Sequence, residues 1–413
     1  MEQESEGKTL GLLDEKFLKL GVENAPGQEA LQNSQEVGMR GERLPGIPVD
    51  FSHGDVDAFE PVPGSLDIFI AGVHLGARQA YTEYRGSKPV REDAARKLAN
   101  FTGAAIDADR NLIITPGTQG ALFLSMGATV ARGDKVAIVA PDYFANRKLV
   151  EFFDGETVPI RMDYLNATDC AGLDLNQLED AFKAGIKLFL FSNPNNPVGA
   201  IYSSAEIRGI GELAQKHGVT VIADELYSRQ IFEERTYTHL CAQNMIDPEK
   251  LITITGPSKT ESLSGYRLGV AFGSAAIIDR MEKLQAIVSL RAGGYSQAVM
   301  NSWFAEPEGW MKQRIAQHQA IRDDLLKQLR AVEGVRVRTT EAGSYLFPSI
   351  PELDVPIREF VRILRMQADV TATPGTEFGK QFTNSFRINF SQNHQAAVAA
   401  IDRLISVMNR YRK

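Results

Sequence analysis

The sequence predicts an α/β fold in which a large domain with a mostly parallel sheet is followed by a smaller α+β domain. Between about residues 65 and 300, helical patterns alternate with short apolar strands, which is typical of a parallel sheet covered by helices. After Gln297 the pattern changes to long charged helices with a few strands. A chain of 413 residues also exceeds what one hydrophobic core usually supports. We expect an N-terminal arm at 1–50, a large domain at 51–300 and a small domain at 301–413 that packs with the N-terminal segment.

The composition is that of an ordinary globular protein and argues against several functional classes. Hydrophobic residues make up 43% and charged residues 23% of the chain, and the net charge of −7 gives no sign of a nucleic-acid-binding surface. The two cysteines are too few for a disulfide framework or a zinc cluster, so no metal site is expected. The acidic start lacks a secretory signal, and no apolar run is long enough to cross a bilayer. We therefore expect a cytoplasmic protein that binds neither nucleic acid nor membrane.

The first 50 residues are polar apart from one amphipathic segment at 12–20, where apolar residues recur at helical spacing. A short strand at Val49 then breaks into a turn at Gly54. Backbone amides at such a glycine can approach a ligand closely, so Gly54 is a candidate substrate contact. A plain linker between the arm and the large domain is the alternative.

Seven apolar segments of the large domain are predicted strands, and nearly all of them end in a cluster of Gly, Pro, Asn or Asp. Because ligands of open α/β sheets bind beyond the carboxyl ends of the strands, we expect the functional site there. Helical periodicity runs through 91–101. The predicted strands are 112–115, 135–140, 156–160, 187–192, 220–223, 251–255 and 269–272.

The predicted small domain alternates helices and strands less regularly. Its helices are expected at 309–332, near 355–366 and at about 394–412. Its strands are expected at 335–339, 343–347 and 386–390.

Lys259 follows the strand 251–255 in a turn rich in glycine and hydroxyl side chains. A partly desolvated lysine close to another cation, such as Arg267, has a lowered pKa and can attack a carbonyl to form a Schiff base. Any single lysine is more often an exposed loop residue. The neighbouring motifs favour the chemical interpretation.

Two other strand ends carry residues suited to a flat, phosphorylated ligand. Gly117, Thr118 and Gln119 open a helix after a strand, where free amides and the helix dipole attract phosphate, although many such turns bind no anion. Tyr143 follows the next strand and offers a ring for stacking, with simple packing as the alternative.

The segment Ser192-Asn-Pro-Asn-Asn-Pro-Val-Gly199 contains two Asn-Pro steps, which favour a rigid extended turn that presents amide side chains. Asp224 ends a buried strand, where a carboxylate is costly unless it meets a cation. Tyr227 lies three residues further on.

Together these residues predict a site for a phosphorylated pyridine aldehyde. Lys259 would form an imine with the aldehyde, and Asp224 would keep the ring nitrogen protonated, so that the ring accepts electrons from a substrate carbanion. Tyr143 would stack on the ring. Asn196 and Tyr227 would bind the ring hydroxyl, and the phosphate would be held by Gly117, Thr118, Gln119, Ser258 and Arg267.

These motifs, in this order and spacing, resemble the class I/II aminotransferases of fold type I, which use pyridoxal 5′-phosphate. The resemblance rests on Asn193-Pro-Asn-Asn-Pro-Val-Gly199, Asp224-Glu-Leu-Tyr227, Ser258-Lys-Thr with Gly265-Tyr-Arg-Leu-Gly269, and Phe386-Arg-Ile-Asn-Phe390. It covers about residues 50 to 413. It implies a three-layer large domain and transfer of an amino group between an L-amino acid and a 2-oxo acid through an aldimine of Lys259.

The resemblance also implies roles for residues outside the strand ends. Arg387 is similar to the arginine that clamps the substrate α-carboxylate. Tyr81 is similar to a tyrosine lent to the phosphate of a neighbouring subunit, which implies a homodimer with shared active sites. Gly256 departs from the family where a serine is frequent, which removes one phosphate hydroxyl, whereas Val198 and Tyr266 are departures that should not affect the chemistry.

Two questions stay open at this point. Lyases, racemases and decarboxylases use the same cofactor contacts, and a regulator that binds the cofactor without catalysis is a more distant alternative. Arg291 lies near a family position that reads a distal carboxylate, or is a surface residue. Acidic and aromatic amino acids are the leading substrate candidates.

Overall fold

A seven-stranded sheet forms the centre of the computed structural model, which describes residues 11–20, 38–53, 58–76 and 81–413. The strand order is β2-β8-β7-β6-β5-β3-β4, and only β8 runs antiparallel to its neighbours. The predicted mostly parallel sheet is therefore confirmed, and each of the seven strands predicted for the large domain is present. The strands are β2 (Leu112–Pro116), β3 (Lys135–Ala140), β4 (Glu156–Arg161), β5 (Leu188–Ser192), β6 (Thr220–Asp224), β7 (Leu251–Thr255) and β8 (Leu268–Gly273).

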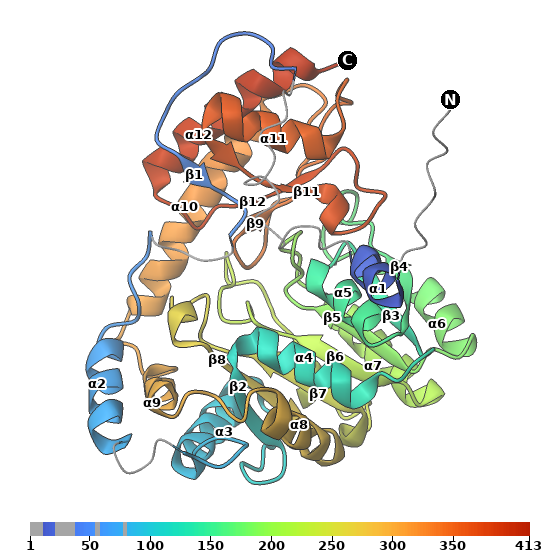
Figure 1. Ribbon diagram of the computed structural model, residues 1–413, viewed down its shortest axis with the longest axis vertical. Coiled ribbons are helices and arrows are strands. Elements are labelled where there is room, and N and C mark those ends of the chain that lie inside the picture. Colours follow the sequence, from blue (N-terminus) through green and yellow to red (C-terminus); the bar gives the residue numbers. More distant parts are fainter. Residues whose placement is uncertain (1–10, 21–37, 54–57, 77–80) are drawn as a thin grey trace, which may run out of the picture.

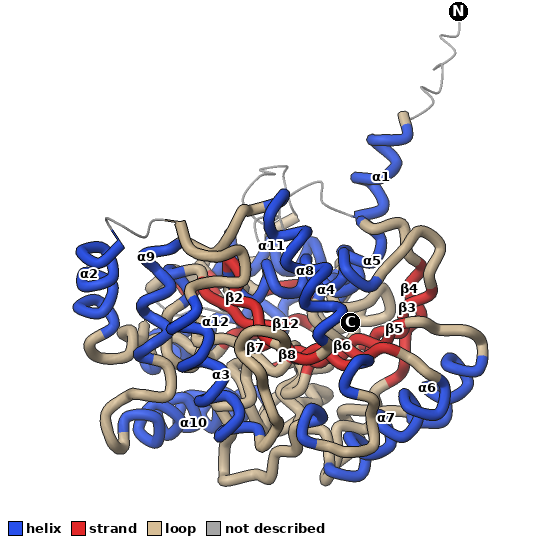
Figure 2. Tube along the Cα trace, turned by 90° about the horizontal axis from the view of Figure 1, so that it is seen from below, coloured by secondary structure: helices blue, strands red, loops and turns tan. Residues whose placement is uncertain are grey.

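Helices cover both faces of this sheet and make three layers (Figure 1 and Figure 2). Side chains of a strand alternate between the faces, so in β5 Leu188 and Leu190 join one core whereas Phe189 and Phe191 join the other. One face is covered by α4 (Gly117–Thr129), α5 (Phe144–Phe152) and α8 (Ala275–Val288), and the other by α3 (Lys88–Thr102), α6 (Leu175–Lys183) and α7 (Ser204–His217).

A separate hydrophobic core lies among the C-terminal elements and includes Val49 and Phe51 from the N-terminal part of the chain. It is built from α10 (Trp310–Arg330), α11 (Ile357–Ala368), α12 (His394–Tyr411) and an antiparallel sheet of β11 (Thr373–Pro374), β12 (Phe386–Asn389) and β9 (Tyr345–Leu346). Next to this sheet, β1 (Val49–Asp50) pairs in parallel with β10 (Val370–Thr371). The remaining helices are α2 (Ser65–Gly76) and the short α9 (Gly294–Gln297).

The predicted strand at 335–339 is wrong. Val335 and Val337 pack as partly buried apolar residues, as the alternation suggested, but Arg336 makes only an isolated bridge to Ser349. Arg338 is instead turned toward another segment, where it donates to the backbone oxygens of Ala167 at 2.7 Å and Cys170 at 2.9 Å. Alternation alone cannot supply the partner strand that a ladder requires.

The N-terminal segment contacts two parts of the molecule. The predicted helix at 12–20 is α1 (Leu12–Leu20), and it lies against α5, where the Lys16 ammonium sits 4.3 Å from the ring centre of Phe152 (Figure 1). Residues 38–51 instead run along α11 and α12, with Arg43 paired to Asp369 at 2.7 Å. Among the described helices, none is long and apolar enough to cross a membrane.

Candidate active site

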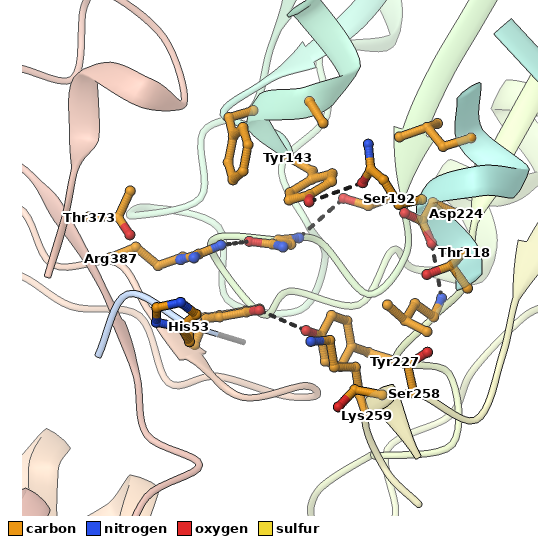
Figure 3. A pocket seen from close by; sticks show the side chains of 18 of the residues that line it. His53, Thr118, Tyr143, Ser192, Asp224, Tyr227, Ser258, Lys259, Thr373 and Arg387 are labelled. Atoms are coloured by element: carbon orange, nitrogen blue, oxygen red, sulfur yellow. Dashed lines mark hydrogen bonds between the residues drawn. The ribbon is translucent and has the colours of Figure 1, made fainter. Parts of the chain in front are cut away.

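A cavity of about 430 Å³ lies between the carboxyl ends of β5, β6 and β7 and the small antiparallel sheet. Figure 3 shows Asp224, Thr118 and Lys259 on one side of it and Arg387 and Thr373 on the other. The structure thus brings nearly all the predicted site residues into one place. Those that line the cavity are Thr118, Gln119, Tyr143, Asn196, Asp224, Tyr227, Ser258, Lys259, Arg267 and Arg387.

Lys259 projects from the turn that follows β7 and is half-buried. Its neighbour Ser258 is anchored by a hydrogen bond of 3.3 Å from Oγ to the backbone oxygen of Leu268. Gly256, where the family often has serine, packs tightly against Thr118, since an added Cβ would lie 3.0 Å from Thr118 Cγ2. The departure at Gly256 is therefore accompanied by a threonine whose side chain lines the cavity.

A compact cationic pocket forms where α4 begins. Gly117 has a positive φ of 78°, and a Cβ at this position would overlap Arg267 Nη2, so only glycine allows the guanidinium to come this close. Arg267 itself adopts a left-handed φ of 54° and donates to the backbone oxygen of Ser264 at 3.0 Å. A guanidinium beside the N-terminus of a helix is suited to binding a phosphate.

Asp224 stands at the end of β6 without a cationic partner among the described residues. Its Oδ1 accepts one hydrogen bond, from Leu226 N at 3.2 Å, and the side chain keeps one face toward the cavity. Burial raises the pKa of Asp224 to about 6, and the neighbouring charge of Glu225 adds to this shift. The cation that the sequence led us to expect beside this carboxylate is therefore not supplied by the described residues, and the cavity side of Asp224 is open to a cationic group of a ligand.

Three tyrosines shape the cavity. Tyr143 OH donates to Gln119 Oε1 at 3.2 Å, and Tyr227 OH lies 2.8 Å from Tyr345 OH. Burial raises the pKa of Tyr143 to about 12 and holds that of Tyr227 well above its ordinary value, so both phenols stay protonated at neutral pH.

Arg387 on β12 is buried, with 3% of its surface exposed, and has no ion-pair partner among the described residues. Its Nη1 donates to Asn196 Oδ1 at 3.0 Å and its Nη2 to the backbone oxygen of Ser52 at 2.7 Å, whereas its Nε has no hydrogen-bond partner. The guanidinium lies 4.3 Å from the ring centre of Tyr345. A buried guanidinium that faces a cavity without a carboxylate partner is suited to binding an anionic group.

Several cavity residues were not predicted as site residues. Ser52 and His53 belong to the turn after the short strand at Val49, and Tyr345 lies in the predicted strand 343–347, so in both places the sequence indicated the segment but not the side chain. Nothing in the sequence pattern distinguished Thr373 or the buried Glu377.

Among the described residues, Gly117 and Tyr81 were predicted site residues but do not line this cavity. Tyr81 is 74% exposed and lies under the guanidinium of Arg291, which is 4.1 Å from its ring centre. Arg291 also donates to the backbone oxygen of Thr82 at 2.6 Å. Gly54 lies outside the described residues.

The sequence profile of the family described as aminotransferase class I and II matches residues 73–404. The chain belongs to this family. The protein is therefore an aminotransferase of fold type I, as its motifs predicted, and members of this family depend on pyridoxal phosphate.

Similar proteins agree with this assignment. A crystal structure of an aspartate aminotransferase from Rhodobacter sphaeroides 2.4.1 is 62% identical to this aminotransferase, with a TM-score of 0.91 over 97% of this chain and 100% of that one. An aspartate aminotransferase from Sulfolobus acidocaldarius is 27% identical over 346 residues, which are 81% of this chain and 84% of the relative. The aspartate aminotransferase from Rhizobium meliloti, 24% identical with a TM-score of 0.80 over 88% of this chain and 92% of that one, shares the fold.

Proposed function

We propose that this aminotransferase moves the α-amino group of an L-amino acid to a 2-oxo acid in the cavity of Lys259, with pyridoxal 5′-phosphate as cofactor. One observation carries the proposal. A single cavity contains a half-buried amine, Lys259, a carboxylate without a cation, Asp224, and a guanidinium without a carboxylate, Arg387.

The cavity residues fit this cofactor. Asp224 needs a cation, and a protonated pyridine nitrogen is one. The close approach of Arg267 to Gly117 at the start of α4 suits a phosphate, with Thr118, Gln119 and Ser258 beside it. Tyr227 and Asn196 would bind the ring hydroxyl and Tyr143 would cover the ring. When bound, the cofactor supplies an electron sink for the electrons released at the substrate Cα.

The chain's own residues would then position the substrate and move its proton. Arg387 would bind the α-carboxylate through two parallel hydrogen bonds, which a planar guanidinium makes better than an ammonium. Because Asn196 Oδ1 is occupied by Arg387, its NH₂ group is the part left to donate to a ligand. The Lys259 amine, which would hold the cofactor before the substrate enters, is the base for the proton at Cα.

We infer a homodimer from residues that lie outside the cavity of their own chain. Tyr81 and Arg291 stack on each other at the surface, and one face of α2 exposes Leu66, Ile70 and Val73. Exposed apolar patches of this kind are typical of subunit interfaces. In a dimer joined through this face, Tyr81 would reach the phosphate bound in the partner's cavity. Arg291 would reach the distal carboxylate of the substrate in that cavity.

Hybrid dimers test the sharing of active sites. A mixture of Tyr81→Ala and Lys259→Ala subunits should be more active than either variant alone, because one site of each hybrid receives both intact residues. Mass measurements should first establish that the variants form dimers and hybrids. If the mixture is then no more active than the variants measured separately, Tyr81 does not serve the partner's site.

The substrate class is the finer part of the proposal. The relatives named aspartate aminotransferases support an acidic amino donor, and Arg291 supplies a cation for its second carboxylate. A panel of acidic, aromatic and small neutral amino donors with 2-oxoglutarate and pyruvate, followed by chiral analysis of the product, tests it. Fastest transfer from aspartate or glutamate with an L-product is the expected result, whereas decarboxylated, racemised or eliminated products would overturn transamination.

A further inference from the structure

A buried carboxylate lies directly behind the cavity wall. Asp142 follows β3 and precedes Tyr143, and only 3% of its surface is exposed. It does not line the cavity, and among the described residues it has no ion-pair partner. Four donors reach its two oxygens. They are Ser192 Oγ at 2.5 Å, Ser192 N at 3.0 Å, Tyr143 N at 2.6 Å and Asn146 Nδ2 at 3.3 Å.

These bonds join two neighbouring strand ends that carry predicted site residues. Tyr143 follows β3, and Ser192 is the last residue of β5, which pairs with β3. The hydroxyl of Ser192 also accepts a hydrogen bond from Asn196 N at 3.1 Å, and Asn196 Oδ1 accepts from Arg387 at 3.0 Å. One continuous hydrogen-bonded chain therefore runs from the Asp142 carboxylate to the substrate-side guanidinium.

A carboxylate in this place has an energetic cost. Burial raises the pKa of Asp142 to about 7, and the charge of Asp224 at the end of β6, on the far side of β5, adds to the rise. The phenol of Tyr202 is another titratable group that interacts with this carboxylate. The hydrogen bonds of Asp142 offset the cost of burying its carboxylate, and they orient two turns that carry site residues. A residue that only closed the first turn of α5 would not need a buried carboxylate.

We propose that Asp142 is a positioning residue that holds Tyr143 and, through Ser192, Asn196 in the geometry needed for cofactor and substrate. The proposal rests on the functions proposed above for Tyr143 and Asn196. Asp142 acts only through its hydrogen bonds and touches neither ligand. An amide at this position keeps the shape of the side chain but replaces one acceptor oxygen with a donor that faces other donors.

The test compares Asp142→Asn, Ser192→Ala and the double variant, with Asp174→Asn as the matched control. Asp174 caps α6 and does not line the cavity, and its side chain accepts from Gln177 N at 2.9 Å. We expect Asp142→Asn and Ser192→Ala each to lower kcat/KM about 10- to 100-fold, mainly through kcat, because small misplacements in an active site have effects of this size. Each should also weaken cofactor binding to the apoprotein, measured by fluorescence titration, whereas Asp174→Asn should change neither quantity.

The double variant separates positioning from fold stability. If Ser192 acts through Asp142, the double variant should lose little more than Asp142→Asn alone, because Asp142→Asn already breaks the link that Ser192→Ala removes. Three outcomes would each overturn the proposal. The first is a loss of kcat/KM in the double variant equal to the product of the two single losses, and the second is unchanged kcat/KM and cofactor affinity in Asp142→Asn. The third is a lowered melting temperature in Asp142→Asn together with full activity in Ser192→Ala. Cofactor titration does not depend on the amino donor, so a wrong substrate assignment leaves this test intact.

Discussion

The two walls of the cavity are built in different ways. Ser192 and Asp224 lie side by side in register at the ends of β5 and β6, and β7 leads to Lys259 one strand further along. The opposite wall joins three distant segments, because Arg387 on β12 donates to the backbone of Ser52, 335 residues away in sequence, and packs on Tyr345 of β9. Sheet register thus positions the first wall, whereas packing of separate segments positions the second.

This difference separates two kinds of chemistry. The strand-end wall has the amine and the carboxylate that the proposed cofactor needs, and the packed wall has the guanidinium for the substrate. Changes in the first wall should affect every reaction of the cofactor. Changes in the second should affect only ligands that carry a carboxylate.

The largest effect is expected for Lys259→Ala in the strand-end wall. Loss of the amine removes both the attachment of the cofactor and the base, so kcat should fall by about 10⁴-fold or more for all donors. Lys312→Ala on the exposed side of α10 is the control. Borohydride reduction of the wild-type holoenzyme followed by peptide mapping should label Lys259, and a label on another lysine would contradict the assignment.

Asp224→Asn should come next, with a loss of about 10³-fold in kcat. The amide cannot stabilise a protonated ring nitrogen, and each factor of ten corresponds to about 1.4 kcal/mol of transition-state stabilisation. Melting temperature and single-turnover rates with an amino acid and with a simple amine measure the effect. Both rates should fall alike, and near-normal turnover would refute the role of Asp224.

Arg387→Lys sharpens the contrast between the walls. The lysine keeps the charge but loses the two parallel hydrogen bonds, so kcat/KM for amino acids should fall about 100-fold. A matched amine without a carboxylate should react with the holoenzyme as before, and cofactor affinity should not change. An equal loss for the amine would mean that Arg387 supports the cofactor rather than the substrate.

The smallest effect concerns pH and the strand-end wall. Asp224 has a pKa of about 6 in the free protein, above its ordinary 3.8, so the folded state binds this proton more tightly than the unfolded state does. Its contribution to the free energy of unfolding therefore decreases as the pH rises from about 4 to about 6. Below pH 6 the carboxyl is mostly neutral and loses its attraction for a cation.

Cofactor affinity should accordingly weaken about tenfold between pH 7.5 and pH 5. Equilibrium dialysis of the wild type and of Asp224→Asn at both pH values isolates this carboxyl from the titration of the cofactor itself. The pH dependence should be smaller in the variant, and identical dependence in both proteins would exclude Asp224 as its source.

The sequence by itself determined the class of the fold and most of the strand-end wall. Periodicity located all seven strands of the large sheet, since buried parallel strands are short apolar runs bounded by turn residues. The motifs around Asn196, Asp224 and Lys259 could be assigned to one site from the sequence because each follows its strand directly. Parallel strands place their carboxyl ends at one edge of the sheet. The membership in the aminotransferase family followed from the same motifs.

Only the tertiary structure decided the packed wall and the residues behind the cavity. Ser52, Tyr345 and Glu377 come from segments far apart in the chain, and no local pattern states which of them meet. The same reason explains the wrong strand at 335–339, which lacks a partner for a full ladder. No pattern in the sequence singled out Asp142. Its hydrogen bonds to Ser192 exist because β3 and β5, about 50 residues apart, are neighbours in the folded sheet.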